Sequence, residues 1–274
     1  MPELPEVETV ARELNRAIHG QKILAVETSW PKLFSRSPGG LARARRELTA
    51  RTIKKVVRSG KRIFIYLSND ILWITHLKMT GAFLWGGKAK ENRFVRAKFR
   101  LSRGTLYFSD IRKFGRMIVG KCEAILKHKD IVGLAPDPFQ ISHPTLRDAL
   151  RKKSIPIKQA LLDQKVIAGI GNIYADEILW ASKIHPLLSA HNINEKNIKS
   201  IIAHARRILK KSIKYGGTSM RDFKNTKGEK GGYLTFCNVY MRENKNCRRN
   251  CGDTINRIMI GSRSTRFCPK CQSK

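Results

Sequence analysis

Residues 52–67 read TIKKVVRSGKRIFIYL, and this stretch decides the fold class of the N-terminal half. Both parts of it are rich in β-branched and aromatic residues, and Ser59-Gly60 separates them, as expected of two strands joined by a turn. Similar short runs lie on either side, at residues 22–30, 71–77, 94–101, 105–109 and 117–119. Ser102-Arg103-Gly104 predicts a hairpin turn between two of them. Many short strands joined by turns indicate an antiparallel sandwich or barrel.

Helical patterns frame these strands. Residues 3–18 predict a leading helix, because Val7, Val10, Leu14 and Ile18 recur at three- and four-residue steps before Gly20. After the turn-rich GLAPDP at 133–138, helices are expected at residues 143–152, 155–163, 173–183 and 194–215, followed by a Gly- and Lys-rich loop at 216–232. We therefore expect an α+β protein. Its parts are a β-sandwich domain over 1–132, a linker over 133–138, a helical domain over 139–232 and a cysteine-rich hairpin over 233–274.

The charge balance favours nucleic acid as the partner. The chain has 274 residues with 55 Lys+Arg against 21 Asp+Glu, a net charge of +34, and its 41% of hydrophobic residues suffices for a buried core. Lysine and arginine side chains that neutralise phosphates release counterions from the nucleic acid, which favours binding, so DNA or RNA would match this excess of positive charge. A membrane surface is the rival, but no lipidation motif, basic amphipathic helix or long apolar run occurs. The start MPELPEVE also lacks the features of a signal peptide, so we expect a soluble, intracellular protein.

Four cysteines near the C-terminus form two close pairs. Cys247 and Cys251 are separated by 16 residues from Cys268 and Cys271, and this spacing predicts a zinc ribbon rather than four unrelated thiols. Four thiolates leave no open position for water or substrate, so the zinc would be structural. The remaining Cys122 and Cys237 are interpreted as packing thiols.

The N-terminus offers a nucleophile. Removal of Met1 would leave the secondary amine of Pro2 free, and a free α-amino group has a pKa of about 8, well below that of lysine. Glu3 lies beside this amine and could transfer protons for it. The pair alone supports little, because acidic residues in the first turn of a helix are also explained by the helix dipole.

Several further motifs, taken together in their order along the chain, point to a known family. PELPEVET at the start, HLKMTG at 76–81, SDIRKFG at 109–115, GIGNIYADE at 169–177, GGT at 216–218 and the cysteine ribbon together resemble formamidopyrimidine-DNA glycosylase, a bacterial repair glycosylase and lyase. The resemblance covers essentially the whole chain. Endonuclease VIII, a close relative, typically begins PEGPE, so the start favours the formamidopyrimidine branch.

The resemblance implies a fold and a reaction. The fold would be an N-terminal β-sandwich, a helix–two-turn–helix domain and a zinc hairpin, with damaged duplex DNA in the cleft between the halves. A monomer associated with the bacterial nucleoid would remove oxidised purines and cleave the strand by β,δ-elimination. Pro2 would attack C1′ and form a Schiff base, and Glu3 would be the general acid/base. Lys61 would transfer a proton and contact phosphate, and Arg263 would serve the second elimination.

The resemblance also implies DNA contacts. A wedge that fills the gap left by the everted base would consist of Met79, Arg112 and Phe114. Contacts to the DNA backbone would come from His76, Lys153 and Asn172. Asn92, which stands where the family has a DNA-contacting histidine, is a further candidate DNA contact, and Ile111 and Lys113 depart from the family's Asp-Pro-Arg-Arg-Phe-Gly run. Each residue also has a structural interpretation, as a core histidine, core filler or surface charge. Two functional alternatives stay open, a relative that prefers oxidised pyrimidines and a non-catalytic damage-binding protein.

Overall fold

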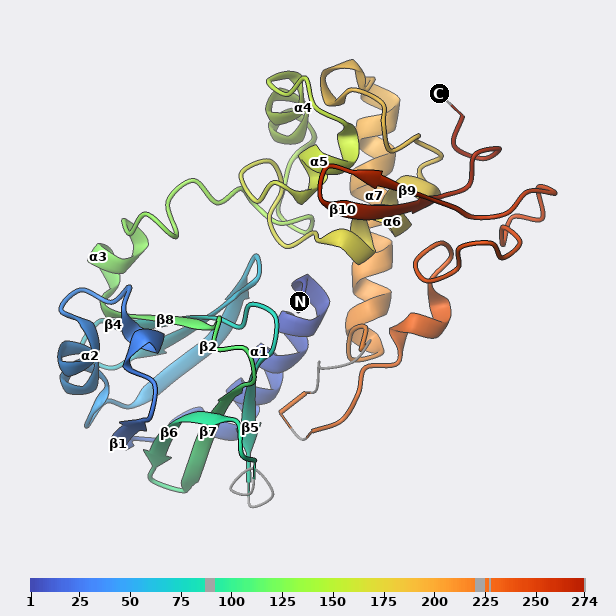
Figure 1. The fold of residues 1–274 in the computed structure, drawn as a ribbon. Coiled ribbons are helices and arrows are strands. Elements are labelled where there is room, and N and C mark those ends of the chain that lie inside the picture. The colour runs from blue at the N-terminus through green and yellow to red at the C-terminus, as the bar shows by residue number, and fades with distance from the viewer. Residues whose placement is uncertain (87–91, 220–224, 227, 274) are drawn as a thin grey trace. The chain divides into compact units, whose positions relative to one another are not determined.

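A computed structural model describes residues 1–86, 92–219, 225–226 and 228–273 (Figure 1). The chain forms two compact units. Unit 1 contains Met1–Gly133 and Gly216–Gly232, and unit 2 contains Leu134–Tyr215 and Tyr233–Lys274. The mixed α+β class expected from the sequence is confirmed, with antiparallel sheets in unit 1 and helices with a β-hairpin in unit 2.

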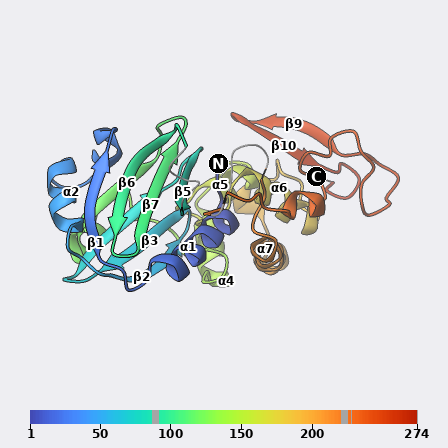
Figure 2. The ribbon, with the colours of Figure 1, turned by 90° about the horizontal axis from the view of Figure 1, so that it is seen from below.

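Unit 1 is built on two four-stranded antiparallel sheets. The first has the order β1-β6-β7-β5, whose strands Figure 2 shows side by side, and the second has the order β2-β3-β4-β8. Their bounds are Ile23–Thr28 (β1), Val95–Leu101 (β6), Gly104–Asp110 (β7) and Gly81–Trp85 (β5), then Ile53–Ser59 (β2), Arg62–Leu67 (β3), Ile71–His76 (β4) and Arg116–Lys121 (β8). The Trp73 ring from the second sheet packs on Phe99 and Phe83 of the first, at centroid distances of 4.4 and 5.9 Å. These contacts between buried aromatic rings make a sandwich of the two sheets.

Helix α1 (Leu4–Ile18) confirms the leading helix, and its predicted apolar positions are all buried. Within unit 1, three further helical elements and strand β5 (Gly81–Trp85) have no counterpart among the expected elements; the helical elements are η1 (Pro31–Phe34), α2 (Gly40–Leu48) and α3 (Cys122–Leu126). Helix α2 is hard to predict because its sequence GLARARREL buries only Ala44 and Leu48, which gives little periodicity.

The helices expected in unit 2 are present, with ends that differ by one or two residues. They are α4 (His143–Arg151), α5 (Ile157–Leu162), α6 (Asn172–Ala181) and α7 (Glu195–Lys214), with short η3 (Ala190–Asn192) and η4 (Tyr233–Phe236) and the hairpin β9 (Asn256–Ile260) and β10 (Arg263–Phe267). Helices α4 and α7 begin where Ser142 and Asn194 accept hydrogen bonds from the N–H groups of Thr145 and Asn197, which are standard N-caps. No helix in the described part of the chain has the length and hydrophobicity that a bilayer crossing requires.

The compact units differ from the expected division at residues 216–232, which pack with the sandwich rather than with the helices. Carboxylates of α1 explain this. Glu6 accepts the N–H of Thr218 at 2.6 Å, and Glu13 accepts the N–H of Thr226 at 2.9 Å. Partners more than 200 residues apart leave no local signal in the sequence. Part of the predicted loop, residues 220–224 and 227, lies outside the described residues.

Candidate functional site

The predicted nucleophile and acid lie at the start of α1. Glu3 is the N-cap of the helix, and its backbone N–H donates to Glu6 Oε2 at 2.8 Å while its side chain accepts from the N–H of Glu6. This reciprocal capping box fixes the backbone of Glu3 and makes its side chain an acceptor for the helix N-terminus. Pro2 and Glu3 are both buried, whereas Met1 is half exposed. Removal of Met1 would therefore uncover the Pro2 nitrogen at a rigid helix start.

Glu6 is a residue that the sequence reasoning did not single out. Its carboxylate is 2% exposed and joins the Glu3 N–H to the Thr218 N–H. Gly217 is needed for this approach, since a Cβ there would lie 2.7 Å from Glu6 Oε1 and its φ is +84°. The GGT motif is thus held against the first turn of α1. In the sequence, this contact is marked only by the presence of a glutamate in PELPEVET and of the distant GGT motif.

Lys61 lies in the turn between β2 and β3, in the same unit as α1. Gly60 supplies the positive φ, +55°, that this tight turn requires. Arg58 donates to Glu8 Oε2 on α1 at 2.8 Å and to the Gly60 carbonyl at 3.2 Å, so it ties the turn to the helix. Lys61 itself is 5% exposed, which excludes the interpretation of a mere surface lysine.

His76 ends β4 in a strongly positive environment. Burial, and then the charges of Lys78, Arg62 and Lys61, hold the pKa of His76 well below its ordinary value of 6.5. Its Nδ1 accepts the N–H of Lys78 at 3.0 Å. The neutral ring therefore carries its proton on Nε2, where it can donate to an anion. Arg62, which follows Lys61 in the chain, pairs with His76 in the register of β3 and β4, so the two predicted residues are near one another in the sheet.

The three predicted wedge residues lie together on the surface. Arg112 donates to the Met79 sulfur at 3.7 Å, and its guanidinium lies 4.7 Å from the centre of the Phe114 ring. Met79 and Phe114 are 40% and 45% exposed, so neither is a core residue. They border a cavity of about 370 Å³ whose wall also contains His76, three arginines and Lys78, with Asp130 as its only acid. An apolar tip beside a basic hollow suits insertion into a stack next to phosphates.

Asp110 holds the wedge loop, and the sequence reasoning overlooked it. It is fully buried and accepts the N–H of Gly115 at 2.7 Å, the N–H of Arg112 at 3.1 Å and the Thr80 hydroxyl at 2.5 Å. The segments that carry Met79 and Phe114 are thereby joined at one carboxylate. Asn92, by contrast, uses its Oδ1 to accept the N–H of Phe94 at 2.9 Å. Its amide oxygen therefore serves the turn that leads into β6.

In unit 2, Asn172 and the hairpin that carries Arg263 are brought together. Asn172 is the first residue of α6, and its Nδ2 donates to the Ser264 carbonyl at 3.1 Å. Lys158 donates to the same carbonyl at 3.0 Å and pairs with Asp176 at 2.5 Å. Arg263 begins β10 and is exposed. The Ser264 carbonyl thus joins the start of α6, which is predicted to bind phosphate, to the strand that carries Arg263.

The choice of Lys153 among the lysines of this region gains no support from its contacts. Lys153 Nζ pairs with Asp163 at 2.9 Å on the partly exposed surface. Lys158, five residues later, is instead fully buried between Asp176 and the strand β10. Burial raises the pKa of the Asp176 carboxyl, and the Lys158 ammonium opposes that shift. A wholly buried lysine could not be recognised from its sequence neighbours.

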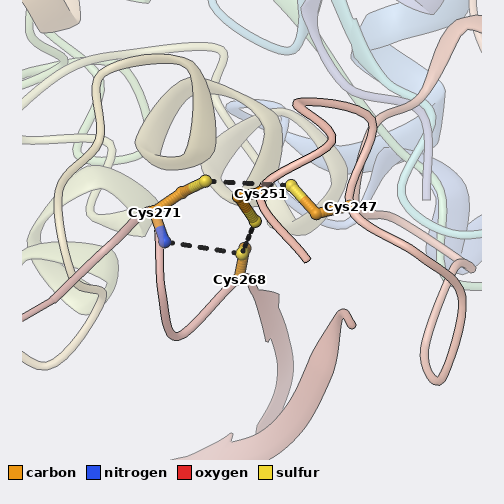
Figure 3. A group of neighbouring side chains, drawn as sticks. All are labelled: Cys247, Cys251, Cys268 and Cys271. Atoms are coloured by element: carbon orange, nitrogen blue, oxygen red, sulfur yellow. Dashed lines mark hydrogen bonds between the residues drawn. The ribbon is translucent and has the colours of Figure 1, made fainter. Parts of the chain in front are cut away.

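The four predicted metal ligands converge (Figure 3). All their sulfur atoms lie within 4.8 Å of one another, with 3.9 Å between Cys247 and Cys271 and 3.5 Å between Cys251 and Cys268. Tetrahedral zinc with Zn–S bonds of about 2.3 Å would separate its sulfurs by about 3.8 Å. Three residues separate Cys247 from Cys251, one more than separate Cys268 from Cys271, and one of the three, Asn250, has a φ of +53°. Asparagine tolerates this left-handed conformation, so the longer spacing fits one structural zinc.

The leftover cysteines differ in their surroundings. Cys237 is buried, as expected of a packing thiol, while Cys122 is half-buried at the start of α3. Neither lies in the metal cluster.

Family models match three parts of the chain. They are described as the formamidopyrimidine-DNA glycosylase N-terminal domain over residues 1–117, the formamidopyrimidine-DNA glycosylase H2TH domain over 133–224, and a zinc finger found in FPG and IleRS over 245–274. The chain is 37% identical to the Bacillus subtilis formamidopyrimidine-DNA glycosylase, with all of both chains covered. It is 40% identical to that of Pelotomaculum thermopropionicum, with 99% of each covered.

Solved structures of similar proteins contain DNA. A complex of the Lactococcus lactis Fpg with an abasic-site DNA has a TM-score of 0.90 at 35% identity and covers 99% of this chain and 100% of that one. MutM in complex with DNA containing carbocyclic 8-oxo-G has a TM-score of 0.90 at 36% identity, with both chains fully covered.

Proposed function

Because this chain belongs to the formamidopyrimidine-DNA glycosylase family, we propose that it removes oxidised purines from duplex DNA and then cleaves the strand at the abasic site. The observation that carries the proposal is the exposed cluster of Met79, Arg112 and Phe114 beside a basic cavity. Large apolar side chains held at the surface by an arginine have little use in a monomeric fold. They can fill the gap that a flipped nucleotide leaves.

The reaction begins at Pro2 once Met1 has been removed. The Pro2 nitrogen forms a bond to C1′ of the damaged nucleotide while the bond from C1′ to the base breaks, and the base leaves with a proton. The C1′–O4′ bond then breaks as O4′ takes up a proton, which leaves an iminium between C1′ and the Pro2 nitrogen. The iminium makes the C2′ proton acidic, and loss of that proton breaks the C3′–O bond, so the strand is cleaved on the 3′ side of the lesion. Glu3, fixed by the capping box, moves the protons at the sugar. A second elimination, to which Arg263 contributes, completes the release.

Phosphate contacts come from both units. Lys61 and His76 act in unit 1, and His76 donates through Nε2 because its ring is neutral. Asn172 acts in unit 2 at the positive end of α6, where backbone N–H groups and the helix dipole favour an anion. Cys247, Cys251, Cys268 and Cys271 hold one structural zinc that stabilises the hairpin, with no open position for catalysis. The working form is a monomer associated with chromosomal DNA in the cytoplasm.

A second substrate class has a specific observation in its favour. One similar solved structure is the wild-type Lactococcus lactis Fpg with an oxidised pyrimidine-containing DNA, at a TM-score of 0.90 and 35% identity. We therefore expect some activity on oxidised pyrimidines. Cleavage rates on matched duplexes with one oxidised guanine or one oxidised pyrimidine would rank the two substrates, and a faster pyrimidine reaction would reverse our assignment.

Borohydride trapping tests the enzymatic proposal. Protein shown by mass spectrometry to lack Met1 is expected to form a covalent adduct with DNA that carries an oxidised guanine. Pro2→Gln should give no adduct, because a large second residue retains Met1 and removes the proline amine, while DNA affinity stays within a few-fold. Pro31→Gln, at an exposed position of the same unit, is the matched control and should trap normally. An untrappable processed protein would overturn the proposal.

A further inference from the structure

Unit 2 contains a second hollow that none of the proposed chemistry uses. It has a volume of about 400 Å³ and lies among the end of α6, one face of α7 and the segment from η4 to the first cysteine pair. Figure 1 shows α6 and α7, the two helices that contribute to its wall. None of the residues assigned above to catalysis, the wedge, phosphate contact or zinc belongs to this wall. The volume is at the lower end of the range of small-molecule sites, roughly 300–1,000 Å³.

The wall of this hollow is positive. It contains Arg207, Lys211, Arg248 and Arg249 and no carboxylate. The last two arginines are committed to the fold: Arg248 donates to the Thr235 carbonyl at 3.1 Å, and Arg249 donates to the last carbonyls of α6 at 2.9 and 3.0 Å. Arg207 and Lys211 lie one turn apart on α7 with exposed side chains. They are therefore the cations available to an anion.

A buried acid, Glu177, binds the backbone of Asn238, which belongs to the wall, but its carboxylate is not itself part of the wall. Glu177 lies on α6, and its carboxylate is occupied by the N–H groups of residues 238–240. His204, also in the wall, has a lowered pKa because of burial and the nearby charges of Arg207 and Arg249. The hollow is thus a positive site with a neutral imidazole.

Aromatic rings form the rest of the wall. Trp180, Tyr233 and Phe236 line it, with Lys211 Nζ 4.0 Å from the Phe236 ring centre and Arg249 4.4 Å from that of Trp180. Trp180 is 8% exposed, and neither its indole Nε1 nor Arg249 Nη1 has a hydrogen-bond partner within the described residues. Buried donors of this kind call for an explanation, and an acceptor on a ligand is one.

We propose that this hollow binds a mononucleotide. Its base would stack on the aromatic wall, as bases do on the aromatic rings of single-strand binding sites. Its phosphate would lie between Arg207 and Lys211, because guanidinium and ammonium groups are the side chains that best match phosphate. The proposal is independent of the repair reaction, because it involves none of its residues.

Calorimetric titration of the full-length zinc-loaded protein with adenosine 5′-monophosphate tests the proposal. The nucleotide is expected to bind at least about tenfold more tightly than adenosine or inorganic phosphate alone, since only the nucleotide engages both walls. The double variant Arg207→Gln/Lys211→Gln should weaken binding at least about tenfold. Lys210→Gln/Lys214→Gln removes the same charge from exposed positions of α7 outside the wall and should leave binding unchanged.

Three outcomes would overturn the proposal. One is a nucleotide Kd weaker than about 1 mM, which corresponds to only about −4 kcal/mol. Another is inorganic phosphate binding as tightly as the nucleotide, which would mean an unspecific positive patch. The third concerns the duplex. If the α7 double variant lowers DNA affinity and the slope of log affinity against log salt by about two phosphate contacts, the hollow belongs to the DNA footprint instead.

Discussion

Glu177→Gln tests how the segment leading to the zinc hairpin is held to α6. The Glu177 side chain is fully buried, and its Oε1 accepts the N–H groups of Asn238, Val239 and Tyr240, each at 2.9 Å. Its Oε2 accepts the Asn238 N–H at 2.8 Å and the Asn238 side-chain amide at 3.0 Å. One carboxylate thus satisfies four donors, three of them on consecutive residues.

The cost of the substitution follows from these contacts. Hydrogen bonds to a charged group contribute about 1.5–3 kcal/mol, against about 0.5–1.5 for neutral ones, so three surviving bonds weaken by about 1 kcal/mol each. The new amide N–H₂ faces the Asn238 side-chain donor and leaves it without an acceptor, which costs about 1–3 kcal/mol more. We expect a loss of about 4–6 kcal/mol in the free energy of unfolding. At about 2–4 °C per kcal/mol for a chain of this size, the Tm falls by roughly 8–24 °C.

Thermal unfolding of the zinc-loaded protein, followed by circular dichroism at neutral pH, gives the measurement. Glu195→Gln is the matched control, because Glu195 is an exposed carboxylate on α7 that pairs with Arg151 at 3.4 Å and His143 at 2.9 Å. Exposed pairs contribute about 1 kcal/mol or less, so its Tm should fall by a few degrees at most. Equal Tm shifts in the two variants would refute the reasoning. If Glu177→Gln does not fold, Asn238→Ala removes one donor and should cost about 1 kcal/mol.

Other predictions follow from the same contacts. Gly217→Ala should cost at least about 1–2 kcal/mol of stability in urea unfolding, because an l-residue at φ +84° is strained and its Cβ would meet Glu6; unchanged stability would mean that residues 216–218 shift freely. His76→Gln should remove a pH dependence. The pKa of His76 is lower in the folded protein than its ordinary value of 6.5, so below about pH 6.5 the unfolded chain binds a proton that the folded protein does not. The free energy of unfolding of the wild type should therefore fall as the pH drops below about 6.5, and that of the variant should fall less. Chelation of zinc should abolish hydrogen-exchange protection in residues 247–271 and weaken DNA binding, both restored by added zinc; persistent protection would argue against a structural metal.

The elements that could be predicted from the sequence are those with strong local periodicity. The run at 52–67 became β2 and β3, with the turn at Gly60-Lys61, one residue after the expected position, and the three- and four-residue spacing of α1 was confirmed. Strand β5 reads GAFLW, with no alternation and with glycine at its start, so it gives no signal of its own. It becomes a strand because it pairs with β7, and such pairing cannot be predicted from the propensities of its own residues.

The candidate site divides in the same way. Met79, Phe114 and the four cysteines could be found from motifs, because their residue types and spacings carry the signal without knowledge of the fold. The structure brings the wedge residues together and the cysteines together, while the roles of Pro2, Glu3, Lys61 and Arg263 stay predictions. Glu6 and Glu177, which position parts of the site, were not predicted, because their hydrogen-bond partners lie far along the chain. Thr218 lies 212 residues from Glu6, and the hydrogen-bond partners of Glu177 lie 61–63 residues away.

These positioning residues also bear on the surplus of positive charge. Glu3, Glu6, Asp110 and Glu177 are all buried, and the hydrogen bonds given above place them on backbone N–H groups of their own units. A carboxylate that satisfies buried N–H groups cannot also neutralise a surface arginine or lysine. In a chain with 21 acids, each one withdrawn into the interior leaves another cation unopposed at the surface. The basic surface that attracts DNA is therefore partly a consequence of how acidic side chains fix the loops of the site.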